Sequence, residues 1–108
     1  MKDRTKALAI RRGVKLEVAA RDSVDGWPCC LWCGRPAPSG KLLAFSCAHY
    51  ISRAQGGLGI PENILTLCPD CHAEYDATEN RQDMREFFKA WLIKKYPDWQ
   101  EELLVYKK

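Results

Sequence analysis

The sequence predicts an α+β fold for a single small domain, residues 1–108, and three observations support this fold class. Two Cys-x-x-Cys pairs enclose two short apolar segments, residues 42–50 and 64–67, which have the length of strands. Apolar residues recur with helical periodicity near both ends of the chain. A chain of 108 residues forms one modest core, so a cross-link or a bound metal would help to fix its loops.

The N-terminal segment, residues 1–22, is expected to be a basic helical arm, with the helix over residues 4–21. Its apolar residues recur near the 3.6-residue period of a helix, at Ala7, Ile10, Val14 and Val18. Gly13 weakens the middle of this run and can split the helix in two. Residues 22–28 follow as a turn-rich connector.

The central part of the chain, residues 28–79, is expected to hold a pair of strands and one helix. The first apolar segment would form a strand that ends near His49, and the second segment would form its partner. The Gly-rich residues 52–62 would connect the two strands as a loop. The helix is expected to begin at Pro69 or Asp70, because proline suits the first turn of a helix.

The C-terminal part, residues 80–108, is expected to be helical. The core-facing stripe of one long helix comprises Met84, Phe87, Phe88, Trp91 and Leu92. Asn80, with Asp83 three residues later, is a start signal for this helix, and Pro97 ends it. Residues 99–105 can add a short helix capped by Asp98.

The net charge of +3 is unevenly distributed along the chain. Residues 1–21 carry seven Lys or Arg against two acidic residues, a net charge of +5, and residues 22–108 have a net charge of −2. A basic arm on a near-neutral body suggests a polyanionic partner, but charge alone favours the plainer alternative, a solvated helix face. We find no segment with the pattern of a signal peptide or the length of a membrane span, so we expect a cytoplasmic protein with reduced thiols and no membrane partner.

Four cysteines form two pairs with the spacing of zinc knuckles. The pairs are Cys30 with Cys33 and Cys68 with Cys71. Two such pairs complete a tetrahedral site with no open coordination position, so we expect a structural zinc ion there. A redox Cys-x-x-Cys is the alternative, but no βαβ pattern surrounds either pair. The two remaining cysteines, Cys29 and Cys47, are expected to be small buried apolar residues.

The two histidines of the chain, His49 and His72, both lie near cysteines, which favours metal chemistry for at least one of them. On a helix that begins near residue 69, His72 and Asp76 are four residues apart and share a face. A histidine and a carboxylate can bind one divalent cation and leave positions for water and phosphate. A simple hydrogen bond between the two side chains explains the same spacing, so both interpretations stay open.

The order of these motifs resembles the HNH endonuclease family, whose ββα-metal core cuts DNA. The motifs are Cys-x-x-Cys, His-x-x-x-Arg-x-x-Gly-Gly, Asn, and Cys-x-x-Cys-His, and the resemblance covers residues 14–76. The runs Ala-His-Tyr-Ile-Ser-Arg and Lys-Tyr-Pro-Asp-Trp are similar to those of small HNH proteins encoded by bacterial phages. The resemblance therefore implies a ββα-metal HNH core, stapled by the four-cysteine zinc site, between the N-terminal and C-terminal helices.

The resemblance also implies a role for each residue of the motifs. His49 would be the general base that takes a proton from water. Asn63 would hold the His49 ring through a backbone or side-chain hydrogen bond. His72 and Asp76 would bind the catalytic divalent ion, whereas the four cysteines would bind the structural zinc.

Four basic residues are candidates for contacts with phosphate. Arg53, four residues after His49 in the Gly-rich loop, is placed to contact a phosphate, and a plain surface charge is the alternative. In the arm, Arg11, Arg12 and Lys15 would make sequence-independent phosphate contacts, and binding would then depend strongly on salt.

One position departs from the family pattern. The family usually places Asp or His directly before the base histidine as a metal ligand, but here that residue is Ala48. Either His72 and Asp76 hold the ion together with water and phosphate oxygens, or another side chain substitutes. Weaker metal affinity would follow, and an inactive fold is the extreme case.

The resemblance implies a metal-dependent DNA endonuclease with one catalytic ion, Mg²⁺, Mn²⁺, Ni²⁺ or Zn²⁺, that nicks DNA or cuts it with weak specificity. DNA is the expected partner, and phage packaging or recombination proteins are further expected partners. The expected location is the cytoplasm of a bacterial host cell, with the gene carried by a phage or prophage. The alternative is a non-catalytic zinc-binding module that binds nucleic acid or protein. Ala48 favours this alternative, whereas His49 and Asn63 argue against it.

Overall fold

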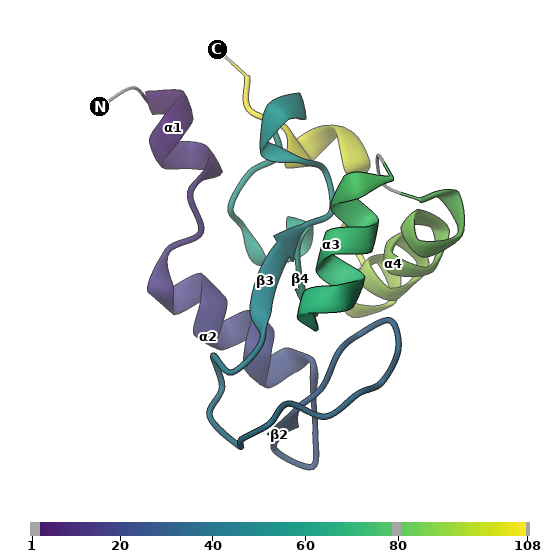
Figure 1. Ribbon diagram of the computed structural model, residues 1–108. Helices are drawn as coiled ribbons and strands as arrows, with labels where there is room; N and C mark the ends of the chain where they lie inside the picture. The colour runs from purple at the N-terminus through teal and green to yellow at the C-terminus, as the bar shows by residue number, and fades with distance from the viewer. Residues whose placement is uncertain (1–2, 79–80, 108) are drawn as a thin grey trace.

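The computed structural model describes residues 3–78 and 81–107. Its centre is an antiparallel pair of strands, β3 (Ser46–His49) and β4 (Ile64–Leu67), in which His49 lies opposite Ile64. Helix α3 (Pro69–Ala77) follows β4, so the chain contains the expected strand–strand–helix unit. Helices lie towards both ends of the chain (Figure 1), and the predicted α+β fold class is confirmed.

The strand pair lies between two helices. Helix α2 (Arg12–Arg21) packs on one side of β3 and β4, and α3 packs on the other side (Figure 1). All four residues of β4 are buried, because both faces of this strand are covered. The first strand begins only at Ser46, later than predicted, because a hydrogen bond from the Ala44 N–H to the Lys41 carbonyl closes a turn just before it.

The N-terminal arm contains two helices, α1 (Asp3–Leu8) and α2, and the break between them is not at Gly13. Gly13 lies inside α2, and the break falls after Leu8. The Ala7 carbonyl accepts a hydrogen bond from Gly59 N–H (2.9 Å), and the Leu8 carbonyl lies 2.9 Å from His49 Nε2. Partners outside the helix therefore use the carbonyl groups at the end of α1.

The connector after α2 contains a hairpin that the sequence analysis did not predict. Strands β1 (Ser23–Val24) and β2 (Trp27–Pro28) pair antiparallel around Asp25 and Gly26. Both turn residues have positive φ angles, 51° and 81°, which is the geometry that an Asp-Gly turn favours. The Asp-Gly dipeptide was therefore a hairpin signal as well as a turn signal.

Arg21 and Asp22 form a buried network that joins α2 to β4. Arg21 donates two hydrogen bonds to the Asp22 carboxylate and further ones to the carbonyls of Pro61 and Ile64. The Asp22 carboxylate also accepts a hydrogen bond from the Thr66 N–H (3.0 Å). Arg21, one of the basic residues of the arm, is thus a structural residue rather than a free surface charge.

The C-terminal part begins with α4 (Gln82–Lys95), whose buried stripe is Met84, Phe88 and Leu92. Asn80, the predicted start signal, lies outside the described residues. The final segment is a 3₁₀ helix, η3 (Glu101–Leu104), which begins after Gln100, so the predicted cap at Asp98 is wrong. Among the described residues, no helix is both long enough and apolar enough to cross a membrane.

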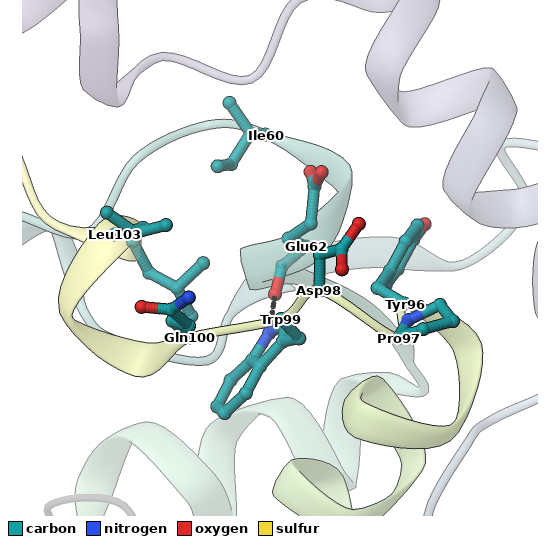
Figure 2. A pocket seen from close by; sticks show the side chains of 9 residues that line it. Ile60, Glu62, Tyr96, Pro97, Asp98, Trp99, Gln100 and Leu103 are labelled. Carbon is teal, nitrogen blue, oxygen red and sulfur yellow. Dashed lines mark hydrogen bonds between the residues drawn. The ribbon is translucent and has the colours of Figure 1, made fainter.

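The loop between β3 and β4 is held by both ends of the chain. It contains two 3₁₀ helices, η1 (Arg53–Gln55) and η2 (Pro61–Asn63). Besides the bond from Gly59 to the arm, Leu58 N–H donates to the Leu104 carbonyl (2.8 Å). The Trp99 indole N–H donates to the Glu62 carbonyl (2.8 Å), as the dashed line in Figure 2 shows. Segments distant in sequence therefore fix the loop that follows His49.

Candidate functional site

The four paired cysteines come together in one cluster. The Sγ atoms of Cys30, Cys33, Cys68 and Cys71 all lie within 4.8 Å of one another. The Cys33 and Cys68 sulfurs are 3.8 Å apart. A tetrahedral zinc ion with bonds of about 2.3 Å places its sulfur ligands about 3.8 Å apart, so this cluster fits a structural zinc site.

Local backbone structure brings each cysteine pair into position. Gly34 has a φ of 78° and donates its N–H to the Cys30 carbonyl, which closes the turn of the first knuckle. Cys68 is the N-cap of α3, and Cys71 lies in the first turn of that helix. The other two cysteines, Cys29 and Cys47, are only partly buried, so the prediction that both are buried core residues is wrong.

Beside the strand pair lies a groove of about 830 Å³ that contains the predicted base and the two predicted ligands of the catalytic ion, but not Asn63. His49 enters it from the end of β3, and His72 and Asp76 enter it from one face of α3. Arg53 and Cys47 also line this groove. The fold therefore brings together two histidine rings, the Asp76 carboxylate and the Arg53 guanidinium group from separate elements.

His72 and Asp76 face each other as their four-residue spacing predicts. The His72 Nε2 atom lies 3.1 Å from the Asp76 carboxylate, and both side chains are partly exposed. The other ring nitrogen, Nδ1, lies 2.8 Å from the Ser46 hydroxyl. If Nδ1 donates to Ser46, two acceptors face each other across 3.1 Å, and a cation would relieve their repulsion. If Nε2 carries the proton instead, the pair is a plain hydrogen bond.

His49 has a defined hydrogen bond at one ring nitrogen. Its Nε2 atom lies 2.9 Å from the Leu8 carbonyl, which can only accept, so Nε2 carries a proton. Burial lowers the pKa of His49, the hydrogen bond to Leu8 opposes this effect, and the positive Arg53 adds to it. The ring is therefore neutral at pH 7, and its Nδ1 atom has the free lone pair.

Asn63 is buried and fixes the loop behind His49. Its side chain accepts the Ile51 N–H (2.8 Å) and donates to the carbonyls of Ile51 (3.2 Å) and Leu58 (2.9 Å). Its own carbonyl accepts the Tyr50 N–H (2.7 Å). These bonds act on the backbone next to His49, whereas the ring itself contacts the Leu8 carbonyl.

Ala48 lies in the hydrophobic core. It is 0% exposed, and Leu65, its partner across the strand pair, is also fully buried. Among residues 3–78 and 81–107, no third His, Cys, Asp or Glu gathers with His72 and Asp76 in a ligand cluster. Any ion at this pair would therefore need water or substrate oxygens to complete its coordination.

The four basic candidates lie in two different environments. Arg53 lines the groove, and Lys15 lines a neighbouring hollow that also includes Arg53 and Cys47. Arg11 and Arg12 are exposed and line neither hollow. Arg53 is thus the candidate that shares the groove with His49, and Lys15 lies in the adjoining hollow.

A separate hollow of about 240 Å³ lies beside the C-terminal segment (Figure 2). It is lined by Ile60, Glu62, Trp99 and Leu103, among others, and by no histidine or cysteine. Because this hollow offers neither an imidazole nor a thiol, the histidine groove remains the candidate for chemistry.

Two contributors to the groove were not foreseen from the sequence. Ser46 contacts His72 through a hydroxyl, and Leu8 contacts His49 through a backbone carbonyl. Ser46 lies three residues before His49 in a strand, where a serine has no special signature. A backbone carbonyl is present in every residue, so only the fold reveals the role of Leu8.

Comparisons with known proteins agree with this geometry. Residues 30–77 match the family model described as HNH endonuclease, and the predicted recognition of that family is confirmed for this segment. Among curated proteins, the chain is 38% identical over 39 residues to anaredoxin from Nostoc sp. strain PCC 7120. The aligned segment covers 36% of this chain and 51% of anaredoxin, so the chain spans about half the length of that relative.

Proposed function

We propose, on the premise that residues 30–77 are an HNH segment, that this protein is a metal-dependent endonuclease that hydrolyses phosphodiester bonds of DNA. One observation carries this proposal. A neutral His49 with a free Nδ1 shares one groove with the His72 and Asp76 pair. This arrangement supplies a proton acceptor next to a place where a divalent ion and a phosphate can bind.

His49 acts as the general base in this proposal. Its Nδ1 lone pair takes a proton from a water molecule, which then attacks the phosphorus atom of the DNA backbone. The lowered pKa of His49 keeps the ring unprotonated at pH 7, as a base must be. Arg53 binds the substrate phosphate from the same groove.

His72 and Asp76 would hold the catalytic ion. The donor set, one imidazole nitrogen and one carboxylate 3.1 Å apart, fits a divalent cation that keeps open positions. When bound, such an ion polarises the phosphate and stabilises the leaving oxyanion. Ser46 orients the His72 ring so that Nε2 faces Asp76.

A non-catalytic zinc-binding module is the second candidate. Ala48 replaces a usual metal ligand of the family and is fully buried, which leaves only two protein ligands in the groove. The relative matched above is named anaredoxin rather than as a nuclease. In this case the four-cysteine cluster would hold the fold, and the groove would bind without cutting. The phage origin, the cytoplasmic location, and the packaging or recombination partners stay predictions from the sequence resemblance.

The assay that separates the two candidates is cleavage of supercoiled plasmid with Mg²⁺, Mn²⁺, Ni²⁺ or Zn²⁺. We expect His49→Ala to lower the cleavage rate by about 10²-fold to 10⁴-fold, the usual contribution of a general base. Asp76→Asn should also reduce cleavage, whereas Asp70→Asn, an exposed carboxylate on the same helix, should not. All variants should retain zinc, and the two aspartate variants should also retain the melting temperature of the wild type.

Two outcomes of the cleavage assay would contradict the proposed function, and one would contradict the ligand role of Asp76. A wild-type protein that cuts with none of the four metals, or a His49→Ala variant that cuts as fast as wild type, would leave the non-catalytic module as the function. Equal losses for Asp76→Asn and Asp70→Asn would contradict the role of Asp76 as a ligand.

A further inference from the structure

The N-terminal arm reaches the candidate base from the far end of the sequence. Leu8, 41 residues before His49, places its carbonyl 2.9 Å from the Nε2 atom of the ring. The Leu8 side chain is 2% exposed, so this part of the arm is packed into the molecule rather than lying loosely on it. The HNH match begins at residue 30, so this contact comes from outside the matched segment.

The loop after His49 binds the arm through specific contacts. Gly59 N–H donates to the Ala7 carbonyl (2.9 Å), and Arg4 donates to the Arg53 carbonyl (3.3 Å). A Cβ atom added at Gly59 would lie 2.0 Å from the Ala9 carbonyl oxygen. The arm can therefore occupy this position only because residue 59 has no side chain.

We propose that residues 7–9 are a positioning element of the catalytic site, in which the Leu8 carbonyl holds the His49 ring with its proton on Nε2 and its lone pair on Nδ1. The proposal rests on the proposed function, because it gives a role to the arm within the same reaction. The HNH segment would then depend on a preceding part of the chain to orient its base.

The chemistry of the imidazole ring supports this role. A neutral histidine exists as two tautomers, and a hydrogen bond at one nitrogen decides which nitrogen has the lone pair. The charged and titratable groups near His49 are Arg53, His72 and Asp76, and none of them has a hydrogen bond to the ring among the described residues. The Leu8 carbonyl is thus the group that selects the tautomer and the ring orientation.

The tautomer can be measured directly by NMR of the ¹⁵N-labelled, zinc-loaded protein at pH 8, without DNA. The chain has two histidines, so a His72→Ala variant assigns the signals of His49. We expect wild-type His49 to be predominantly the Nε2–H tautomer. A wild-type ring with the proton mainly on Nδ1 overturns the proposal without any further variant.

The matched pair of variants is Gly59→Ala, which displaces the arm, and Gly13→Ala, where an added Cβ has no neighbour within 4 Å. We expect Gly59→Ala to mix the tautomers of His49 and to slow plasmid cleavage by about 10-fold to 100-fold, with zinc content unchanged. Gly13→Ala should match wild type in both measurements. If Gly59→Ala keeps the pure Nε2–H tautomer and full cleavage, the arm has no positioning role.

The failure of this inference and of the proposed function give different results. If wild type cuts DNA but the tautomer is insensitive to Gly59→Ala, only the inference fails. If no metal supports cutting, the proposed function fails, and the tautomer measurement still decides whether the arm orients the ring.

Discussion

The four-cysteine cluster and the histidine groove are built on the same helix, yet they have opposite designs. Cys71 and His72 are neighbours in α3, but Cys71 joins three other thiols, whereas His72 faces Asp76 and Ser46. All four ligands of the cluster come from the protein. The groove offers two proposed ligands, and both side chains are accessible to water. A closed set of ligands stabilises a fold, and an open set leaves room for a substrate.

The two regions also differ in what supports them. The first knuckle is tied to β4 by a hydrogen bond from the Leu31 N–H to the Thr66 carbonyl (2.9 Å). The groove depends on the loop after His49, which the arm and the C-terminal segment hold from outside the core unit. We therefore expect changes at the cysteines to affect the whole fold, and changes at the loop to affect mainly the groove.

The largest expected effect is loss of the fold on removal of a cysteine. Cys30→Ser should abolish the cooperative thermal transition, because zinc binding to such a site supplies folding free energy on the order of 10 kcal/mol. The matched control is Cys29→Ser, one residue earlier and outside the cluster, which should retain about one zinc ion per chain. Circular dichroism and elemental analysis of zinc measure both properties. A Cys30→Ser protein that melts like wild type would show that the four-cysteine cluster does not stabilise the fold.

The contrast between the two regions explains what could be predicted from the sequence. The cysteine cluster has a strict spacing that sequence displays directly, and β4 and α3 begin at the predicted residues. The pairing of His72 with Asp76 followed from helical periodicity alone. In each case residues within a few positions of one another in the sequence determine the feature, so its pattern can be recognised directly.

The remaining features depend on contacts between distant residues. The break in the arm lies after Leu8 because the carbonyls there bind Gly59 and His49, whereas helix propensity pointed to Gly13. Arg21 is one of the basic residues of the arm, but its side chain is only 10% exposed and pairs with Asp22. No periodicity or motif records such contacts, so the sequence could not reveal them.

A second test concerns the loop and should separate it from the cysteine cluster. Asn63→Ala leaves three backbone groups, on Ile51 and Leu58, without their side-chain partner, so we expect a loss of about 2–4 kcal/mol of stability. For a domain of this size each kcal/mol lowers the melting temperature by about 4–8 °C. Cleavage should fall as well, because the backbone next to His49 loosens, while zinc remains bound.

The control for this test is Glu62→Ala, next to Asn63 in η2, whose side chain lines the C-terminal hollow. It should change the melting temperature by no more than a few degrees, as is usual for a surface substitution. Loss of zinc from Asn63→Ala would show that the loop and the cysteine cluster unfold together. In that case the two regions would not be separable.

The smallest expected effect concerns phosphate contacts along the groove. The logarithm of DNA affinity falls with the logarithm of salt concentration, with a slope of about 0.9 for each phosphate contacted. Arg53 and Lys15 line the groove and the adjoining hollow, so Arg53→Ala and Lys15→Ala should each remove one phosphate contact and reduce this slope by about 0.9.

The control for this test is Lys94→Ala, because Lys94 is exposed in the last turn of α4 and lines neither hollow. This variant should leave the slope unchanged. Arg12→Ala then reports how far the DNA extends along the arm, because Arg12 is exposed but does not line the groove. Fluorescence anisotropy in a series of salt concentrations measures these slopes, and an unchanged slope for both Arg53→Ala and Lys15→Ala would place the DNA elsewhere on the protein.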